Sequence, residues 1–210
     1  MTMTRPSMRL IALLAALAAT TALGGCAPLL FGGAIVGGSM MAIDRRTSGT
    51  QVDDQTIEVK GIKRVSETIG DRGSVSVTSY NHVVLLTGTV TNEADKAAVE
   101  RAVGAIESVR SVVNEVAIGT AASFGNRSSD TLVTSKVKAS FVDAKDLQVN
   151  AFKVVTERGV VYLMGRVTER EANRAADIAR GVSGVTKVVK VFEIVTEAEL
   201  AELQPKPAKP

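Results

Sequence analysis

Cysteine and histidine are the side chains that most often act as nucleophiles, proton carriers or metal ligands, and this sequence has one of each. Cys26 is the only cysteine and His82 the only histidine among the 210 residues. A disulfide within one chain and a Cys/His metal cluster are therefore both excluded. His82 falls in a predicted turn, where we expect it to be solvated rather than catalytic.

Carboxylate pairs and glycine-rich loops could support acid–base chemistry or phosphate binding, but their positions here favour neither. We expect the aspartates at 53–54 to be linker charges, and Glu169 and Glu171 to be helix-start charges. Gly88 and Gly165 belong to no phosphate-loop or GxGxxG pattern, so we expect them to mark tight backbone packing. The sequence therefore predicts a protein that is not an enzyme and holds no metal or dissociable cofactor.

The first 25 residues have the pattern of an export signal. Arg5 and Arg9 precede an apolar stretch from Leu10 to Leu23. That stretch is shorter than the roughly twenty residues that a membrane-spanning helix needs. Two glycines follow it, directly before Cys26, and their small size would let a peptidase approach closely. We therefore predict a signal peptide over residues 1–25.

The sequence LGGC at residues 23–26 resembles the lipobox of bacterial lipoproteins, in which the cysteine receives a diacylglyceryl group and the signal is cut just before it. The resemblance implies a covalent lipid on Cys26, which would become the first residue of the mature chain. Ala27 stands where an inner-membrane retention signal would carry Asp, which implies sorting to the outer membrane and a periplasm-facing protein. Two or more acyl chains would anchor it stably. The alternative is a free cysteine behind an ordinary signal peptide.

Residues 26–50 are predicted to be a lipidated, glycine-rich tether and linker. The apolar stretch 27–43 contains four glycines, which disfavour a stable isolated helix. Its seventeen residues lie at the lower limit for a membrane span, so a second span is the competing interpretation. The segment that begins at Asp44 is polar and flexible in composition.

The most informative feature is an internal repeat, because the chain matches itself at offsets of 75 to 77 residues. The sequence VVLLTGTVT at 83–91 corresponds to VVYLMGRVT at 160–168, and VRSVV at 109–113 corresponds to VTKVV at 185–189. The chain therefore contains two copies of one domain, over residues 51–119 and 127–196.

Each copy shows the same order of helix and strand patterns. A helix over 54–69 or 130–142 is followed by two strands, a second helix and a last strand over 110–118 or 186–195. We therefore predict an α+β fold of two tandem αββαβ domains, each a small three-stranded sheet covered by two helices. Because copies of this size are close to the lower limit for an independent core, we expect them to pack on each other.

Several local signals fix where these elements begin and end. Short turns are predicted at 80–82 and 157–159, between the first two strands of each copy. Thr168 and Glu171 have the spacing of a capping box, which would start the second helix of the second copy. Residues 197–210, a charged segment followed by a Pro/Lys tail, are predicted to be disordered.

The two copies resemble the BON domain, and the matching stretches are VVLLTGTVTNEADKAAVERAVGAIESVRSVV and VYLMGRVTEREANRAADIARGVSGVTKVV. With a lipobox ahead of them, the chain is similar to outer-membrane lipoproteins that carry two BON domains. That resemblance implies a periplasm-facing, non-enzymatic protein that binds anionic phospholipid and supports envelope integrity. In some members it also implies a location at the division site.

Net charge differs between the copies, with −3 over 51–119 and +4 over 127–196, so the second copy is the better candidate for an anionic surface. By resemblance, its first helix is where lipid contact is expected. The predicted contact residues are Leu132, Val133, Lys136, Lys138, Phe141 and Lys145. The alternative interpretation is that the apolar residues of this helix are core and its lysines merely solvated.

Other partners remain to be weighed against phospholipid. A protein-interaction adaptor of the envelope assembly or division machinery, using the repeated sheets, shares every sequence feature with a lipid-binding protein. A nucleic-acid module is disfavoured because aromatic residues make up 3% of the chain and the export signal removes access to cytoplasmic DNA.

Overall fold

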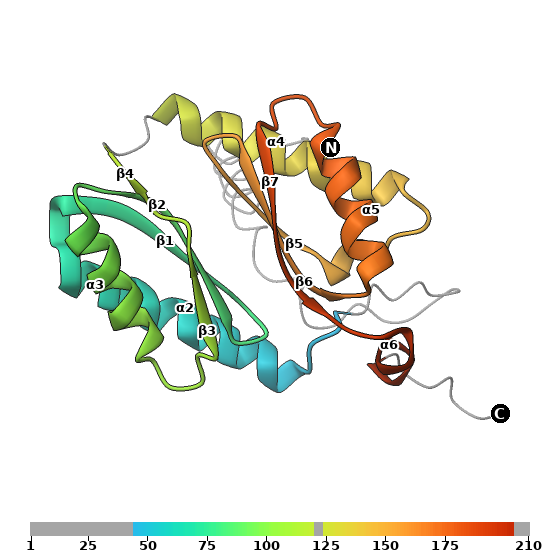
Figure 1. Ribbon diagram of the computed structural model, residues 1–210, viewed down its shortest axis with the longest axis horizontal. Helices are drawn as coiled ribbons and strands as arrows, with labels where there is room; N and C mark the ends of the chain where they lie inside the picture. The colour runs from blue at the N-terminus through green and yellow to red at the C-terminus, as the bar shows by residue number, and fades with distance from the viewer. Residues whose placement is uncertain (1–43, 120–123, 204–210) are drawn as a thin grey trace, which may run out of the picture. The chain divides into compact units, whose positions relative to one another are not determined.

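The computed structural model describes residues 44–119 and 124–203 (Figure 1). The predictions for the signal peptide, Cys26 and the tether up to residue 43 lie outside these residues. Within them, no helix is long and apolar enough to cross a membrane.

The first domain has the predicted order of elements, with one change in the last strand. Its elements are α2 (Ser48–Ile69), a 3-10 turn (Gly70–Arg72), β1 (Gly73–Tyr80), β2 (Val83–Val90), α3 (Glu93–Gly104), β3 (Ser111–Asn114) and β4 (Ala117–Ile118). β1 pairs antiparallel with β2, and both β3 and β4 pair parallel with β2. The sheet is thus four-stranded rather than three-stranded, because the predicted last strand is interrupted at Glu115 and Val116.

The second domain has the predicted αββαβ order and a three-stranded sheet. Its elements are α4 (Phe124–Asp143), a 3-10 turn (Val149–Ala151), β5 (Lys153–Glu157), β6 (Val160–Val167), α5 (Glu169–Arg180) and β7 (Lys187–Ile194). β6 lies in the middle, antiparallel to β5 and parallel to β7. The α+β prediction is therefore confirmed, although both first helices begin six residues earlier than the sequence pattern indicated, at 48 rather than 54 and at 124 rather than 130.

The predicted turns and tight glycine sites are confirmed in both domains. Positive φ angles at Asn81 and His82, and at Arg158 and Gly159, give two-residue turns that match the twist of the flanking strands. A Cβ atom at Gly88 would collide with the backbone carbonyl of Ser74, and one at Gly165 with that of Ala151. The backbones therefore approach too closely at these strand positions for any larger residue.

The helices cover one face of each sheet, α2 and α3 in the first domain and α4 and α5 in the second (Figure 1). The other faces of the two sheets share a further buried cluster, made of Tyr80, Leu85, Tyr162 and Met164. Burial raises the pKa of both tyrosines to about 12. The predicted packing of the two domains on each other is thus confirmed, and it joins sheet to sheet.

The chain after the second domain does not become disordered where the sequence indicated. Glu197–Leu203 forms α6, whose Leu200 is buried. Thr196 caps it, because the Thr196 hydroxyl accepts from the backbone N–H of Glu199 at 3.2 Å. The prediction of disorder was therefore wrong for 197–203, and residues 204–210 lie outside the described part.

Candidate lipid-binding surface

One side of α4 belongs to the core of the second domain. Val133, Val137 and Phe141 recur every four residues, so they share the helix face that packs on the sheet, and all three are buried. The Phe141 ring lies 5.2 Å from that of Phe152, measured between centroids. The prediction that Val133 and Phe141 contact lipid was therefore wrong, because both side chains fill the space between helix and sheet.

The rest of the α4 surface carries exposed apolar and cationic side chains. Leu132 is 63% exposed and Val142 is 66% exposed. Lys136 and Lys138 are also exposed, as is Lys145 just after the helix. Within residues 44–119 and 124–203, none of these lysines forms an ion pair. The structure thus places four of the six predicted contact residues on the surface and adds Val142, which the sequence analysis missed.

A shallow groove of about 510 Å³ runs beside this surface, between α4 and the end of α5. It is lined by Lys136, Ala139, Ser140, Asp143, Ile178, Gly181, Val182 and Ser183. Its walls offer one lysine, two hydroxyl groups and aliphatic carbon, with Asp143 as the one acid. A cation and hydroxyl donors beside apolar carbon suit the phosphate of a phospholipid and the start of its acyl chains.

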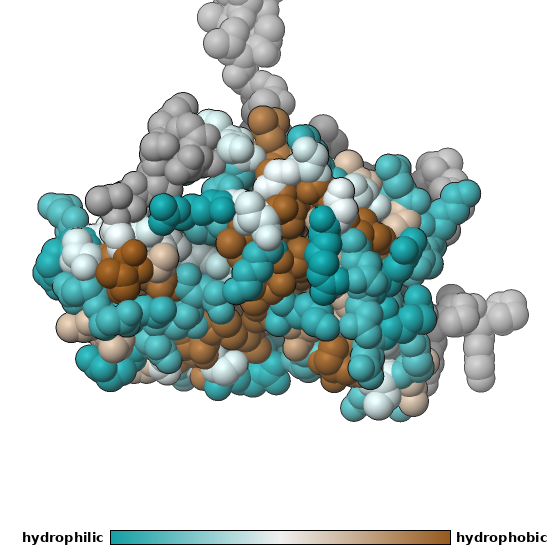
Figure 2. All heavy atoms as spheres, turned by 45° about the horizontal axis from the view of Figure 1, so that its top comes forward, coloured by the Kyte–Doolittle hydropathy of each residue, from teal (hydrophilic) through white to brown (hydrophobic). Residues whose placement is uncertain are grey.

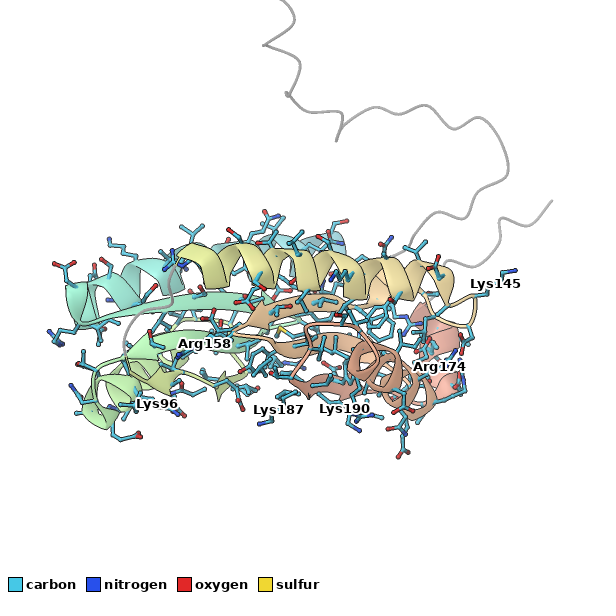
Figure 3. All side chains as sticks on the ribbon, turned by 90° about the horizontal axis from the view of Figure 1, so that it is seen from above. Lys96, Lys145, Arg158, Arg174, Lys187 and Lys190 are labelled. Atoms are coloured by element: carbon cyan, nitrogen blue, oxygen red, sulfur yellow. The ribbon has the colours of Figure 1, made fainter. Side chains whose placement is uncertain are left out.

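Other cations of the second domain, such as Lys187 and Lys190, lie away from α4. Figure 3 shows Lys145 projecting near the end of α4, whereas Lys187 and Lys190 of β7 point toward the opposite side. Apolar side chains also reach the surface elsewhere, as the brown band on the face in Figure 2 shows. The α4 surface has both kinds of side chain on one helix.

Two buried aspartates, one in each domain, have the same structural role. Asp54 accepts hydrogen bonds from the backbone N–H groups of Asn81 and His82 at 2.7 and 2.8 Å, and from the Ser79 hydroxyl at 2.7 Å. Asp130 accepts from the N–H groups of Arg158 and Gly159 at 2.7 and 2.8 Å. Each carboxylate therefore fastens the hairpin turn of its own domain to the first helix.

Asp54 is thus not the linker charge that was predicted. Burial alone would raise its pKa, but the hydrogen bonds from Ser79, His82, Arg46 and Asn81 outweigh burial and hold the pKa below its usual value. The signal that could have revealed this role is the repeat, because Asp54 and Asp130 occupy the same place in the two copies.

The segment before α2 is also not the flexible linker that its composition indicated. Arg45 forms a bidentate ion pair with Glu171 at the start of α5, with both Nη–Oε distances at 2.8 Å and side-chain exposures of only 3% and 4%. Arg45 Nη1 also donates to the carbonyl of Arg166 at 2.8 Å. The neighbouring Arg46 contacts the first domain, through Asp54 at 2.8 Å and the face of Tyr80 at 4.2 Å.

Glu171 has two roles at once. The capping box with Thr168 is confirmed, since the Thr168 hydroxyl accepts from the N–H of Glu171 and Glu171 accepts from the N–H of Thr168. Burial opposes ionisation of Glu171, but the bonds from Arg45 and Thr168 outweigh burial and lower its pKa. Sequence reasoning found the cap and missed the ion pair, because the two partners are 126 residues apart.

His82 remains a turn residue. Its Nδ1 lies 3.0 Å from the carbonyl of Ser108, and its Nε2 lies 3.6 Å from a carboxylate oxygen of Asp53. In the part of the chain that the structure describes, no group of three or more His, Cys, Asp or Glu residues is placed to hold a metal ion.

Comparisons with known proteins agree with the repeat and the fold. The family model of the BON domain matches residues 53–120 and 129–196. The chain is 40% identical to the outer membrane lipoprotein DolP of Haemophilus influenzae, over 91% of this chain and 98% of that protein. It is 35% identical to a 21 kDa hemolysin of Actinobacillus pleuropneumoniae, over 73% of this chain and 80% of that protein.

Among solved structures, CdsD of the type III secretion system of Chlamydia trachomatis covers 68% of this chain and 96% of its own, with 13% identity and a TM-score of 0.28. The two BON matches together span more than half of the chain. This protein therefore belongs to the BON-domain family and carries two BON domains in tandem.

Proposed function

We propose that this protein is an outer-membrane lipoprotein, anchored through lipid on Cys26, whose second BON domain binds anionic phospholipid head groups and so supports envelope integrity. The location is that of its relative from Haemophilus influenzae, whose name describes an outer membrane lipoprotein. The lipobox-like sequence LGGC supplies the attachment site.

The observation that carries the lipid proposal is the exposed surface of α4, where Leu132 lies one turn from Lys136 and Val142 lies one turn from Lys138. A cation near an anionic membrane contributes about 1 kcal/mol, and an inserted leucine adds roughly 1 to 2 kcal/mol when part of its surface leaves water. Such affinity is modest for a free protein. It is sufficient for one whose anchor already raises its concentration at the membrane.

The competing adaptor function loses one of its surfaces in the folded protein. It was expected to use the repeated sheets, but each sheet is covered by helices on one face and by the other sheet on the second. An adaptor would therefore have to bind through helices, loops or strand edges. The exposed surface of α4 supports a membrane partner because it presents aliphatic side chains, Leu132 and Val142, along with lysines that form no ion pair within the described residues.

Vesicle binding tests this proposal directly. Residues 27–210 retain Arg45, Arg46 and both packed domains, and they would be sedimented with neutral vesicles and with vesicles containing phosphatidylglycerol, at low and high salt. We expect salt-sensitive binding to the anionic vesicles alone. Lys136→Glu with Lys138→Glu should weaken it at least roughly tenfold, since each cation contributes about 1 kcal/mol.

The matched control is Lys187→Glu with Lys190→Glu, which makes the same change in net charge on β7, away from α4. It should weaken binding much less than the α4 variant. An equal loss in both variants would show a general charge effect and contradict a site on α4. Binding that ignores both salt and lipid charge, or no binding to any vesicle, would instead favour the protein adaptor.

A further inference from the structure

The repeat places a second groove in the first BON domain, at the same position as the groove beside α4. It lies between α2 and the segment after α3, has a volume of about 360 Å³, and is lined by Lys60, Lys63, Arg64, Glu67, Ala105, Ile106 and Glu107. Each lining residue that has a counterpart in the other groove is offset from it by 76 positions. Lys60 corresponds to Lys136, Glu67 to Asp143, and Ile106 to Val182.

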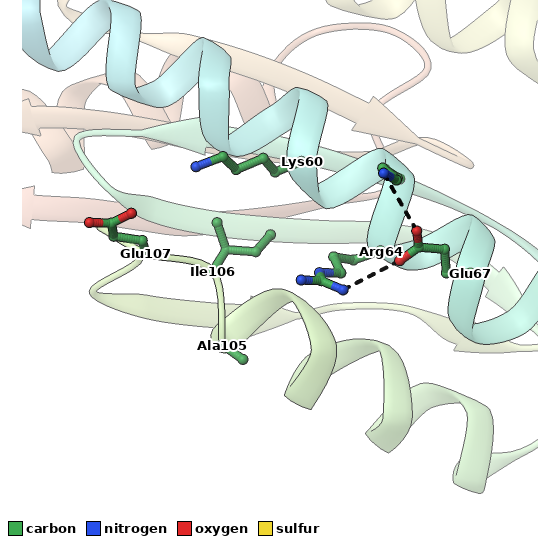
Figure 4. Close-up of a pocket in the computed structure, with 7 residues that line it drawn as sticks. Lys60, Arg64, Glu67, Ala105, Ile106 and Glu107 are labelled. Atoms are coloured by element: carbon green, nitrogen blue, oxygen red, sulfur yellow. Dashed lines mark hydrogen bonds and ion pairs between the residues drawn. The ribbon is translucent and has the colours of Figure 1, made fainter.

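The first groove is the more cationic of the two. Lys63 and Arg64 stand where the second groove has Ala139 and Ser140. Figure 4 shows Lys60 and Arg64 reaching from α2 toward Ile106, with Glu67 bridging Arg64 and Lys63. The bridging distances are 3.4 and 3.8 Å, between groups that are half exposed or more. Such exposed pairs are weak, so both cations can turn toward an anion at little cost.

Exposed aliphatic side chains accompany these cations on α2. Val59 is 70% exposed, and Val52 and Ile62 are also largely exposed. Val52, Val59 and Lys63 are spaced by seven and four residues, so they follow one side of the helix. A helix that presents cations and large aliphatic groups together to solvent has the pattern of one that lies at a membrane surface.

The net charge of −3 on this domain differs from the charge of the groove beside α2. Several acids of the domain form contacts away from the groove. Asp54 accepts hydrogen bonds from the hairpin turn, Glu58 pairs with Lys153 at 2.7 Å, and Asp95 of α3 pairs with Arg72 at 2.9 Å. Glu67 and Glu107 are the acids that line the groove itself. An anion that enters the groove therefore meets three cations and two acids rather than the domain average.

We propose that α2 is a second membrane contact, at which Lys60, Lys63 and Arg64 bind the phosphate groups of anionic phospholipids while Val59 inserts beside them. The position of α2 in the chain supports this occupant. Only residues 27–47 separate Cys26 from the start of α2, and a chain of that length spans at most about 75 Å. A lipid on Cys26 would thus keep α2 within reach of the bilayer. This proposal does not require α4 to bind lipid.

The absence of cysteine beyond residue 26 makes a direct test possible. In residues 27–210, Val59→Cys, Leu132→Cys and Ala94→Cys would each carry an environment-sensitive fluorophore. Ala94 is the control, because it is exposed on α3 of the same domain as Val59. With phosphatidylglycerol vesicles we expect brighter, blue-shifted emission from the label at 59 and no change at 94. Lys60→Glu with Lys63→Glu should weaken the response at 59 roughly tenfold.

The labels separate this proposal from the one on α4. A response at 132 without one at 59 would overturn the α2 contact and leave the α4 site standing, and the reverse result would do the opposite. A response at 59 that is equal on neutral vesicles or persists at high salt would contradict phosphate recognition. Thermal unfolding of each variant, unchanged from the parent, would show that the fold is intact.

Discussion

In each BON domain an arginine pairs with a carboxylate at the start of the second helix, but the two arginines come from different parts of the chain. In both, a carboxylate in the first turn of the second helix needs a cationic partner, Asp95 in the first domain and Glu171 in the second. Arg72, from the same repeat, pairs with Asp95 at 2.9 Å. The position equivalent to Arg72 in the second domain is Gln148, and there Arg45 supplies the charge from outside the repeat.

The difference shows that the segment before α2 is held against the second domain by a buried ion pair. Arg72 is 57% exposed although Asp95 is buried, so solvent reaches the cation of this pair, whereas Arg45 and Glu171 are both buried. Gln148 still contributes, since its Oε1 accepts from Arg45 Nη2 at 3.4 Å. The second domain therefore depends on a residue that precedes the first domain. The end of the tether is fixed against the second domain before the chain enters α2.

The largest effect that separates the domains should come from removing Arg45. Arg45→Met leaves the Glu171 carboxylate buried without its partner, and we expect a loss of about 3 to 5 kcal/mol in the free energy of unfolding. Arg72→Met, the matched change in the first domain, should cost far less, because solvent already screens its pair. Urea unfolding of residues 27–210 measures both.

A double variant sharpens this result. Arg45→Met combined with Glu171→Met removes both charges and should recover much of the stability, since a buried pair replaced by apolar groups of similar size is often neutral. Equal losses in the Arg45 and Arg72 single variants would contradict the view that burial, rather than pairing itself, distinguishes the two domains.

We expect a smaller difference in unfolding free energy between variants of Asp54 and Asp130, the aspartates that bind the hairpin turns. Asp54→Ala removes bonds from Ser79, Arg46 and two turn N–H groups, whereas Asp130→Ala removes the bonds from two turn N–H groups. We expect losses of about 3 kcal/mol for Asp54→Ala and about 1.5 kcal/mol for Asp130→Ala. Thermal unfolding ranks the two variants, and a larger loss at Asp130 would show that the additional partners of Asp54 contribute little.

The parts of this structure that were predictable are those that depend on neighbours in the sequence. Strand and helix order followed from periodicity, the tight strand sites from glycines at equivalent places, and the α5 start from the spacing of Thr168 and Glu171. The repeat strengthened the strand and helix signals, because the same pattern occurs twice at offsets of 75 to 77 residues.

The parts that were missed depend on contacts distant in sequence or on side-chain direction. Arg45 looked like a linker charge because its partner is far along the chain. Val133 and Phe141 were predicted to contact lipid because the family resemblance points to the whole helix, and the sequence left open which of its apolar residues face the core. The exposed Leu132 and Val142 on the opposite side of the helix blur the amphipathic pattern that would have separated them. The net charge of −3 over residues 51–119 likewise gave no sign of the three cations that line the groove beside α2.

The smallest expected effect is a difference in acid sensitivity. The pKa of Glu171 is lowered in the folded protein from 4.5, so Glu171 contributes stability above about pH 4.5, and that contribution is lost as pH falls through the lowered value. The pKa of Asp95 is lowered from 3.8 by Arg72, so the corresponding loss in the first domain begins at lower pH.

Glu171→Gln should therefore flatten the decline in unfolding free energy that begins near pH 4.5, although it lowers stability at neutral pH by leaving Arg45 without a charged partner. Asp95→Asn should leave that part of the curve unchanged and flatten it only below about pH 3.8. Urea midpoints measured from pH 7 to pH 3 distinguish the two. If the two variants altered the same pH range, the carboxylates would be equivalent, and the buried arginine from the tether would not set the second domain apart.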